Sequence, residues 1–248
     1  MPTVRVAIVQ FDAKPEDVAG NRAKMVDLAR QARTNRARWI LFHEGALCDY
    51  SEQIDRFAEP VPQGESTQTF ADLARELDCV ISFGLSEGNN ERYYISQIFV
   101  GPEGFFHRYR KTWIWSEPSD RGFRNEWARY DPGTGPAAFE VDGVRATCFI
   151  CSDGESPRCL TRARALEPQV VFYPNNRRAM PEFAELGELA RELEAPVLVA
   201  NRVGNSWANY TNGGSVVYGR DGNVLAQANR EGHEEILLHD LNLKTTLS

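Results

Sequence analysis

Short apolar runs alternate with amphipathic, helix-like segments along almost the whole chain, and this alternation limits the possible folds more than any other feature. Apolar residues at helical spacing predict helices over residues 16–36, 67–77, 158–166 and 181–193. Short apolar runs bounded by turn residues predict strands over residues 4–11, 39–42, 79–85, 93–100, 104–110, 137–141, 144–151, 170–173, 197–200, 214–218, 224–228 and 236–241. Strands and helices in alternation are typical of α/β proteins.

The two halves of the sequence repeat one order of elements, in which strands and helices alternate and a hairpin follows. We therefore expect two sheets packed together with helices on the outside. No low-complexity linker divides the chain, so residues 1–248 are predicted to form one domain. Residues 112–135 lack clear periodicity, and a loop of that length often carries function.

The overall composition is that of an ordinary soluble globular protein. The formal net charge of −7 argues against a nucleic-acid or anionic-membrane surface. No run approaches the ~20 apolar residues of a membrane span, and the start of the chain lacks a basic leader before an apolar run. The five cysteines are odd in number and scattered, which favours free thiols in a reducing cytoplasm. We expect a cytoplasmic protein with neither nucleic-acid nor membrane partners.

Three predicted strands end close to residues that carry chemistry. Glu44 follows the run 39–42, Lys111 ends the run from 104, and Cys151 ends the apolar run from 144. Open α/β folds place ligands at the carboxyl ends of their strands. A thiol, a carboxylate and an ammonium that meet there would supply a nucleophile, a base and an oxyanion stabiliser.

With these motifs in this order, the chain resembles the nitrilase superfamily of carbon–nitrogen hydrolases over nearly its whole length. Each motif is weak alone, but their order and approximate spacing together are specific. The motifs are Val6-Ala7-Ile8-Val9-Gln10, Phe42-His43-Glu44, Tyr109-Arg110-Lys111, Ile150-Cys151-Ser152-Asp153, Ala200-Asn201-Arg202-Val203-Gly204 and Gly213-Gly214-Ser215.

The resemblance implies a four-layer α-β-β-α sandwich and a homodimer or a higher even-numbered assembly. It also implies a catalytic set of Glu44, Lys111 and Cys151, joined by a second glutamate before a Pro-Gly turn. Glu126 has the family's distance to Pro132-Gly133, whereas the rival Glu117 lies nearer Lys111.

In the implied chemistry, Glu44 takes the thiol proton while Cys151 attacks an amide carbonyl or a nitrile carbon. Lys111 and the backbone N–H of Ser152 meet the developing negative charge. Glu126 orients Lys111.

Three further residues are candidates for the substrate pocket. Asn175 follows a strand end where family members line the pocket, and Arg177 or Arg178 has a guanidinium that can bind a carboxylate. Trp113 is either a pocket wall or part of the core or of a dimer surface.

The chain departs from the family pattern around the cysteine. Ser152 stands where most amide-cleaving members have an aromatic residue. Glu155 and Arg158 exchange the charges that the family places there, which predicts a retained internal pair. Nitrile-cleaving members show Trp-Glu after the cysteine, so Ser152-Asp153 favours an amide or carbamoyl substrate. His43 replaces the usual proline before Glu44.

Our interpretation is a hydrolase that cleaves a small linear amide or N-carbamoyl compound through a cysteine thioester, releasing ammonia without a cofactor or metal. A nitrilase, a catalytically silent scaffold and an acyltransferase remain alternatives. Cys148 and Cys151 form a lone CxxC, but residues three apart on a strand face opposite sides, so Cys148 is predicted to be core. A Cys–His pair through His43 or His107 stays formally open.

Overall fold

The computed structural model describes residues 3–115, 126–177, 185–206 and 210–243. Its helices are α1 (Val18–Thr34), α2 (Ile54–Phe57), α3 (Glu65–Leu77), α4 (Pro157–Ala165) and α5 (Glu185–Leu193), with short 3-10 helices η1 (Glu126–Ala128) and η2 (Cys151–Glu155). The strands are β1 (Thr3–Gln10), β2 (Trp39–Phe42), β3 (Val80–Asn89), β4 (Arg92–Gly101), β5 (Gly104–Arg110), β6 (Phe139–Val141), β7 (Val144–Cys148), β8 (Val170–Pro174), β9 (Val197–Ala200), β10 (Val203–Asn205), β11 (Tyr210–Asn212), β12 (Val216–Tyr218), β13 (Val224–Gln227) and β14 (Glu235–Asn242).

Two six-stranded sheets form the centre of the described part of the molecule. Their strand orders are β14-β1-β2-β3-β4-β5 and β13-β12-β9-β8-β7-β6. In each sheet three neighbouring strands are parallel, β1–β3 in one and β7–β9 in the other, and antiparallel strands flank them. The predicted repeat of one order in both halves is therefore seen in the topology.

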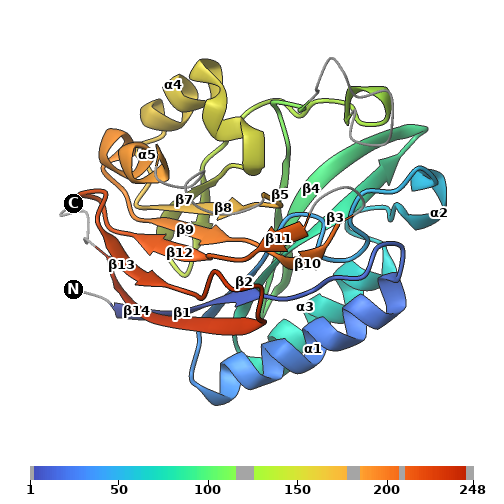
Figure 1. The fold of residues 1–248 in the computed structure, drawn as a ribbon, viewed down its shortest axis with the longest axis horizontal. Helices are drawn as coiled ribbons and strands as arrows, with labels where there is room; N and C mark the ends of the chain where they lie inside the picture. Colours follow the sequence, from blue (N-terminus) through green and yellow to red (C-terminus); the bar gives the residue numbers. More distant parts are fainter. Residues whose placement is uncertain (1–2, 116–125, 178–184, 207–209, 244–248) are drawn as a thin grey trace.

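The two sheets pack face to face, and a helix pair covers the outer face of each (Figure 1). Alternate strand residues divide between two cores, as the period of two requires. Ile8 and Phe172 lie in the core between the sheets, whereas Val9 packs toward α1 and α3 and Val171 packs toward α4 and α5. Three cores between successive layers define the expected α-β-β-α sandwich, and the fold prediction is confirmed.

Local sequence signals explain where the helices begin. The Asp17 side chain accepts a hydrogen bond from the backbone N–H of Gly20 at the start of α1. The Ser156 hydroxyl accepts one from Cys159 at the start of α4, where Pro157 takes the first helical position. The start of α4 lies directly after η2, which fixes the segment that follows Cys151.

Most predicted elements appear with small shifts, but one boundary matters for the site. The run 144–151 was expected to be strand up to Cys151; β7 ends at Cys148, and Cys151 opens η2 instead. The physical reason is the backbone of Cys151, whose φ of 48° is incompatible with a strand. Strand β3 extends to Asn89, and α2, β10 and β11 were not predicted. Residues 181–184 of the predicted helix 181–193 lie outside the described residues.

The last described strand, β14, pairs with the first, β1. β14 pairs antiparallel with β1 along their whole length, from Thr3 with Asn242 to Gln10 with Glu235. The first sheet is thus completed by the C-terminal part of the chain. Among the described residues, no helix combines the length and the apolar character that crossing a bilayer requires.

Candidate active site

Lys111 is buried between two carboxylates at the end of β5. Its Nζ lies 2.9 Å from Oε1 of Glu44 and 2.8 Å from Oε1 of Glu126. Both carboxylates raise the pKa of the Lys111 ammonium well above its ordinary value, against the opposing effect of burial. The lysine is therefore a fixed cation. The predicted residues Glu44, Lys111 and Glu126, which come from three separate segments of the sequence, meet at its Nζ.

Glu44 follows β2, and its two oxygens have different surroundings. Oε1 accepts hydrogen bonds from Lys111 and from the hydroxyl of Tyr50, the latter at 3.0 Å. Oε2 is buried and has no hydrogen-bond partner among the described residues. A buried carboxylate oxygen without a partner is costly to retain. Glu44 thus has one oxygen held in place and one available to accept a proton.

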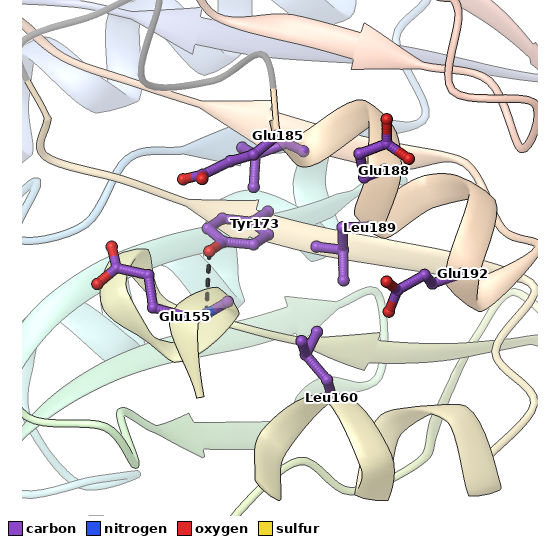
Figure 2. A pocket seen from close by; sticks show the side chains of 9 residues that line it. Glu155, Leu160, Tyr173, Glu185, Glu188, Leu189 and Glu192 are labelled. Atoms are coloured by element: carbon purple, nitrogen blue, oxygen red, sulfur yellow. Dashed lines mark hydrogen bonds between the residues drawn. The ribbon is translucent and has the colours of Figure 1, made fainter. Parts of the chain in front are cut away.

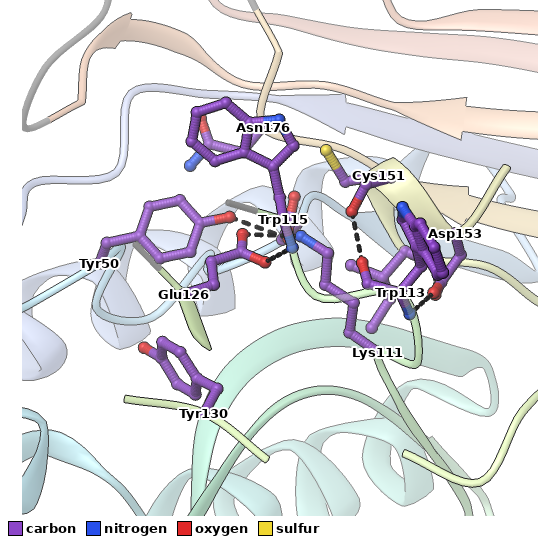
Figure 3. A network of polar contacts seen from close by, with 12 residues as sticks. Tyr50, Lys111, Trp113, Trp115, Glu126, Tyr130, Cys151, Asp153 and Asn176 are labelled. Carbon is purple, nitrogen blue, oxygen red and sulfur yellow. Dashed lines mark hydrogen bonds and ion pairs between the residues drawn. The ribbon is translucent and has the colours of Figure 1, made fainter. Parts of the chain in front are cut away.

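Glu126 lies in η1, within the long segment that was predicted to carry function. Its Oε2 accepts a hydrogen bond from the backbone N–H of Trp115 at 2.7 Å. Burial raises the pKa of Glu126, while Lys111 acts in the opposite direction. Figure 3 shows Glu126 and Tyr50 close to the end of the Lys111 side chain. The rival residue Glu117 lies outside the described residues.

Cys151 is held in a left-handed backbone conformation at the first position of η2. Its carbonyl oxygen accepts hydrogen bonds from the Tyr173 hydroxyl and from Nη2 of Arg177. Burial, and next the Glu44 carboxylate, raise the pKa of the Cys151 thiol to about 11, although Arg177 and Lys111 lower it. The thiol is therefore protonated at neutral pH and needs a base to become a nucleophile.

Asp153 ties the cysteine turn to the lysine segment. One oxygen accepts from the backbone N–H groups of Thr112 and Trp113, at 2.9 and 2.6 Å. The other accepts from the Ile150 N–H at 2.9 Å and the Tyr109 hydroxyl at 2.8 Å. Burial raises the pKa of Asp153 to about 6, and the donors oppose this shift. The carboxylate is thus ionised at neutral pH and fixes Cys151 relative to Lys111.

Ser152, Asn175 and Trp113 occupy different positions around this centre. Ser152 is buried, and its hydroxyl donates to the carbonyl of Trp113 at 2.6 Å. Its backbone N–H belongs to the first turn of η2, where a helix leaves N–H groups without internal partners. Asn175 is fully buried, and its Oδ1 has no hydrogen-bond partner within the described part of the chain. The Trp113 side chain is 48% exposed, so it is not core.

Arg177 contacts the cysteine directly. Its Nε lies 3.4 Å from Cys151 Sγ, and its Nη2 lies 2.7 Å from a carboxylate oxygen of Glu155. Within the described residues Glu155 has no ion pair with Arg158, so the expected internal Glu155–Arg158 pair was wrong. Arg177 reaches Glu155 from the segment after β8, which the spacing of Glu155 and Arg158 gave no means to foresee. Arg178 lies outside the described residues.

A separate cavity of about 120 Å³ lies between η2, α4 and α5. Its floor is apolar and four glutamates surround it (Figure 2). None of Glu44, Lys111, Glu126 and Cys151 lines this cavity. Tyr173 forms part of its wall and accepts a hydrogen bond from the Gly154 N–H at 3.1 Å. The cavity therefore lies behind the cysteine turn and does not contain the four predicted catalytic side chains.

Three residues important to this geometry were missed. Tyr173 had no signal in a single sequence, because its partners Cys151 and Gly154 lie about twenty residues away along the chain. Tyr50 lies only six residues from its partner Glu44, but no motif marks it. Asp153 stood inside the recognised motif, next to Ser152, but no role was assigned to it. Tyr173 and Asp153 act by hydrogen bonds between segments that only the assembled sheet brings together.

A Cys–His pair and a CxxC site find no support in the contacts of the described residues. His43 bonds through Nδ1 to the Glu44 carbonyl and packs on Phe11, and His107 stacks on Phe139 at 4.0 Å. Cys148 is fully buried in the core between the sheets, as predicted. In the described ranges, no group of three or more His, Cys, Asp or Glu side chains is arranged to hold a metal ion.

Comparison with known proteins places this arrangement in a family. The family model described as carbon-nitrogen hydrolase matches residues 5–248. The chain belongs to the carbon–nitrogen hydrolase family. The resemblance predicted from the sequence motifs is therefore confirmed.

Relatives in this family carry several names. A nitrilase from Pyrococcus abyssi is 27% identical over 252 residues, covering 97% of this chain and 90% of its own length. An (R)-stereoselective amidase from a Pseudomonas species is 27% identical, covering 96% of this chain and 86% of its own length. An N-carbamoylputrescine amidase from Oryza sativa subsp. japonica is 26% identical, covering 97% of this chain and 86% of its own length.

Solved structures of the carbon–nitrogen hydrolase fold also match. The amidase of Nesterenkonia sp. AN1 superposes with a TM-score of 0.82 at 22% identity, covering 96% of this chain and 93% of its own. A mutant of that amidase, with acrylamide added to its active-site cysteine, gives the same score, identity and shares of both chains. This likeness confirms the fold.

Proposed function

We propose that this carbon–nitrogen hydrolase cleaves a small linear amide or N-carbamoyl compound through a thioester on Cys151 and releases ammonia. The observation that carries the proposal is the buried Lys111, bonded to both Glu44 and Glu126 beside a thiol on which all three act electrostatically. A cation this tightly held has a structural cost that catalysis explains better than folding does. The family supplies the reaction type.

In the first half-reaction, Cys151 attacks the carbonyl carbon while its proton moves to Oε2 of Glu44. The new S–C bond forms as the carbonyl electrons move onto oxygen, and Lys111 Nζ and the Ser152 N–H stabilise that oxyanion. Loss of one such donor typically costs about 3 kcal/mol. The C–N bond then breaks, and Glu44 transfers its proton to the departing nitrogen, which leaves as ammonia.

In the second half-reaction, water attacks the thioester. Glu44 takes the water proton, the S–C bond breaks, and the proton returns to the Cys151 sulfur. One base serves both halves, because Oε1 is held by Lys111 and Tyr50 while Oε2 stays free. Glu126 keeps Lys111 in place throughout. The high pKa of the thiol is consistent with a mechanism that requires this base.

The test is ammonia release from a panel of linear amides, N-carbamoyl amines and amino acids, and nitriles. We expect release from at least one amide or carbamoyl compound, and loss of it in Cys151→Ala. Intact-mass measurement during turnover should show an acyl adduct that is absent from the variant. Equal ammonia release by the two proteins would refute the thiol mechanism.

A nitrilase is the second candidate, and the Pyrococcus abyssi relative is the observation that favours it. The Ser152-Asp153 pair after the nucleophile favours the amide. The panel decides between them, because a nitrilase converts the nitrile of a matched nitrile–amide pair and leaves the amide. Absence of turnover on every member, with no acyl adduct, would support a catalytically silent protein. Trapping by hydroxylamine would reveal acyl transfer. Cytoplasmic location and even-numbered assembly stay predictions.

A further inference from the structure

The guanidinium of Arg177 occupies a position against the sulfur that the mechanism above does not use. It comes from the segment after β8, whereas Cys151 follows β7, the neighbouring strand in the same sheet. Nε donates to Cys151 Sγ at 3.4 Å, and Nη2 donates to the carbonyl oxygen of the same residue at 2.9 Å. The Arg177 side chain thus contacts both the sulfur and the backbone carbonyl of Cys151.

The position of Arg177 is itself fixed. Its side chain is only 11% exposed, and Glu155 accepts a hydrogen bond from Nη2 at 2.7 Å. The Nη1 atom lies 3.5 Å from Glu185 in α5. Both glutamates are at least half exposed, so water screens their charges more than it screens the contact between Arg177 and the half-buried Cys151. The cation therefore acts most strongly toward the protein interior.

Charge around the thiol shows why such a cation matters. Glu44 and Glu126 oppose loss of the thiol proton, while Lys111, whose charge they share, and Arg177 favour it. Tyr50 and Tyr173 also adjoin the sulfur, but burial raises their pKa values far above neutral, so both stay uncharged. With two carboxylates on one lysine, Arg177 is, within the part of the chain that the structure describes, the cation near the sulfur that no buried carboxylate neutralises.

We propose that Arg177 is a catalytic residue that stabilises the negative charge on the Cys151 sulfur. Glu155 is a positioning residue that holds the guanidinium against the sulfur. The arginine takes no proton; it makes proton transfer to Glu44 easier when the thiol attacks, and it favours the thiolate as leaving group when the thioester is cleaved. The positive charge of Arg177 compensates for the second carboxylate, since Glu44 and Glu126 share the single charge of Lys111.

The experiment measures alkylation of the thiol by iodoacetamide, a neutral reagent. The thiolate forms an S–C bond, iodide leaves, and the thiol proton goes to the buffer. Cys48, Cys79, Cys148 and Cys159 are buried, so intact mass reports a single adduct at Cys151, and Cys151→Ser gives the background. Below its pKa, the alkylation rate follows the fraction of thiolate. This readout does not require hydrolysis.

We expect Arg177→Gln to lower the alkylation rate at pH 8 about tenfold, because an adjacent opposite charge typically shifts a pKa by about one unit or more. Arg177→Lys retains the charge and should recover most of the rate. Arg164→Gln, which removes an exposed charge from α4, should leave it unchanged. Far-ultraviolet circular dichroism establishes that each variant is folded.

A rate in folded Arg177→Gln within twofold of the wild type would overturn the proposal. A role in binding an anionic substrate is distinguishable, because it would raise KM for carboxylate-bearing substrates and leave alkylation unchanged. The proposed hydrolysis fails separately, by absence of ammonia in the panel. A tenfold loss of alkylation would support the role of Arg177 even then.

Discussion

At the scale of single residues, the unequal oxygens of Glu44 are central to the candidate chemistry. Oε1 is fixed by a lysine and a tyrosine, and Oε2 has no partner in the described ranges. A residue that only balanced the charge of Lys111 would gain nothing from a buried, unbonded oxygen. This asymmetry supports the proposed role of Glu44 as a base.

We predict that Glu44→Gln lowers kcat by at least about 100-fold, because the amide keeps the shape of the side chain but cannot take a proton. Ammonia release on the best substrate of the panel measures the loss. Glu52→Gln, an exposed acid in the neighbouring loop, is the control. Near-wild-type turnover in Glu44→Gln would assign the base elsewhere.

Asp153 gives a pH-dependent prediction. Burial raises its folded pKa to about 6 from the ordinary 3.8, so the protonated form is favoured in the fold. The resulting stability is present in full below pH 3.8 and is lost as the pH rises through about 6. The free energy of unfolding of the wild type relative to Asp153→Asn should therefore decrease between pH 4 and pH 7, by up to about 3 kcal/mol. Urea denaturation at several pH values measures this difference, and an increase with pH would contradict the assignment.

The sequence predicted Glu44, Lys111, Glu126 and Cys151 as a group because each stands in a recognisable motif, and the structure brings Lys111 within bonding distance of both acids. The contact between Arg177 and the sulfur was not foreseen. It depends on the path of the chain after β8 and on the rotamer of a long side chain, and neither has a local signature.

At the scale of elements, the turn after β7 sets the position of the nucleophile. β7 stops three residues before Cys151, and η2 then turns the chain toward α4. The apolar run up to Cys151 looked like a continuous strand, because Phe149 and Ile150 are buried apolar residues even though they follow the strand. Strand length could not be predicted there, since a positive φ at a cysteine has no composition signal.

Tyr173 on β8 supports this turn from the adjacent strand. Its hydroxyl donates to the Cys151 carbonyl and accepts from the Gly154 N–H. We predict that Tyr173→Phe lowers the free energy of unfolding by about 1–2 kcal/mol, because the part-buried Gly154 N–H loses its partner and the Cys151 carbonyl keeps only its bond from Arg177. It should also reduce kcat by loosening the turn. Denaturant unfolding and ammonia release test both effects. Tyr210→Phe, at an exposed position of β11, should change neither.

At the scale of the whole molecule, the order of elements predicted the layers well. Periodicities of two and 3.6 identify the faces that strands and helices bury, so the sandwich follows from pattern. The pairing of β14 with β1 did not follow, because periodicity says which face of a strand is buried and nothing about which strand lies next to it.

This pairing makes the C-terminal strand part of the core. Leu241 is 1% exposed and packs between the sheets, whereas Leu238 on the other face of β14 is 36% exposed. We predict that Leu241→Ala lowers the free energy of unfolding by about 2–4 kcal/mol and that Leu238→Ala lowers it by under about 1 kcal/mol. Chemical denaturation of the two variants compares them. Equal losses would mean that β14 does not anchor the first sheet.

The left-handed backbone of Cys151 has a consequence for how this protein tolerates change. Glycine suits that conformation better than any residue with a Cβ, which is strained there by about 1–2 kcal/mol. In chemical denaturation we expect Cys151→Gly to be more stable than Cys151→Ala by about 1 kcal/mol, and both to be inactive. An alanine variant at least as stable as the glycine variant would mean that the conformation is unstrained. Selection for thermal robustness alone would drive this position toward an inert residue, and only selection for turnover would keep the sulfur there.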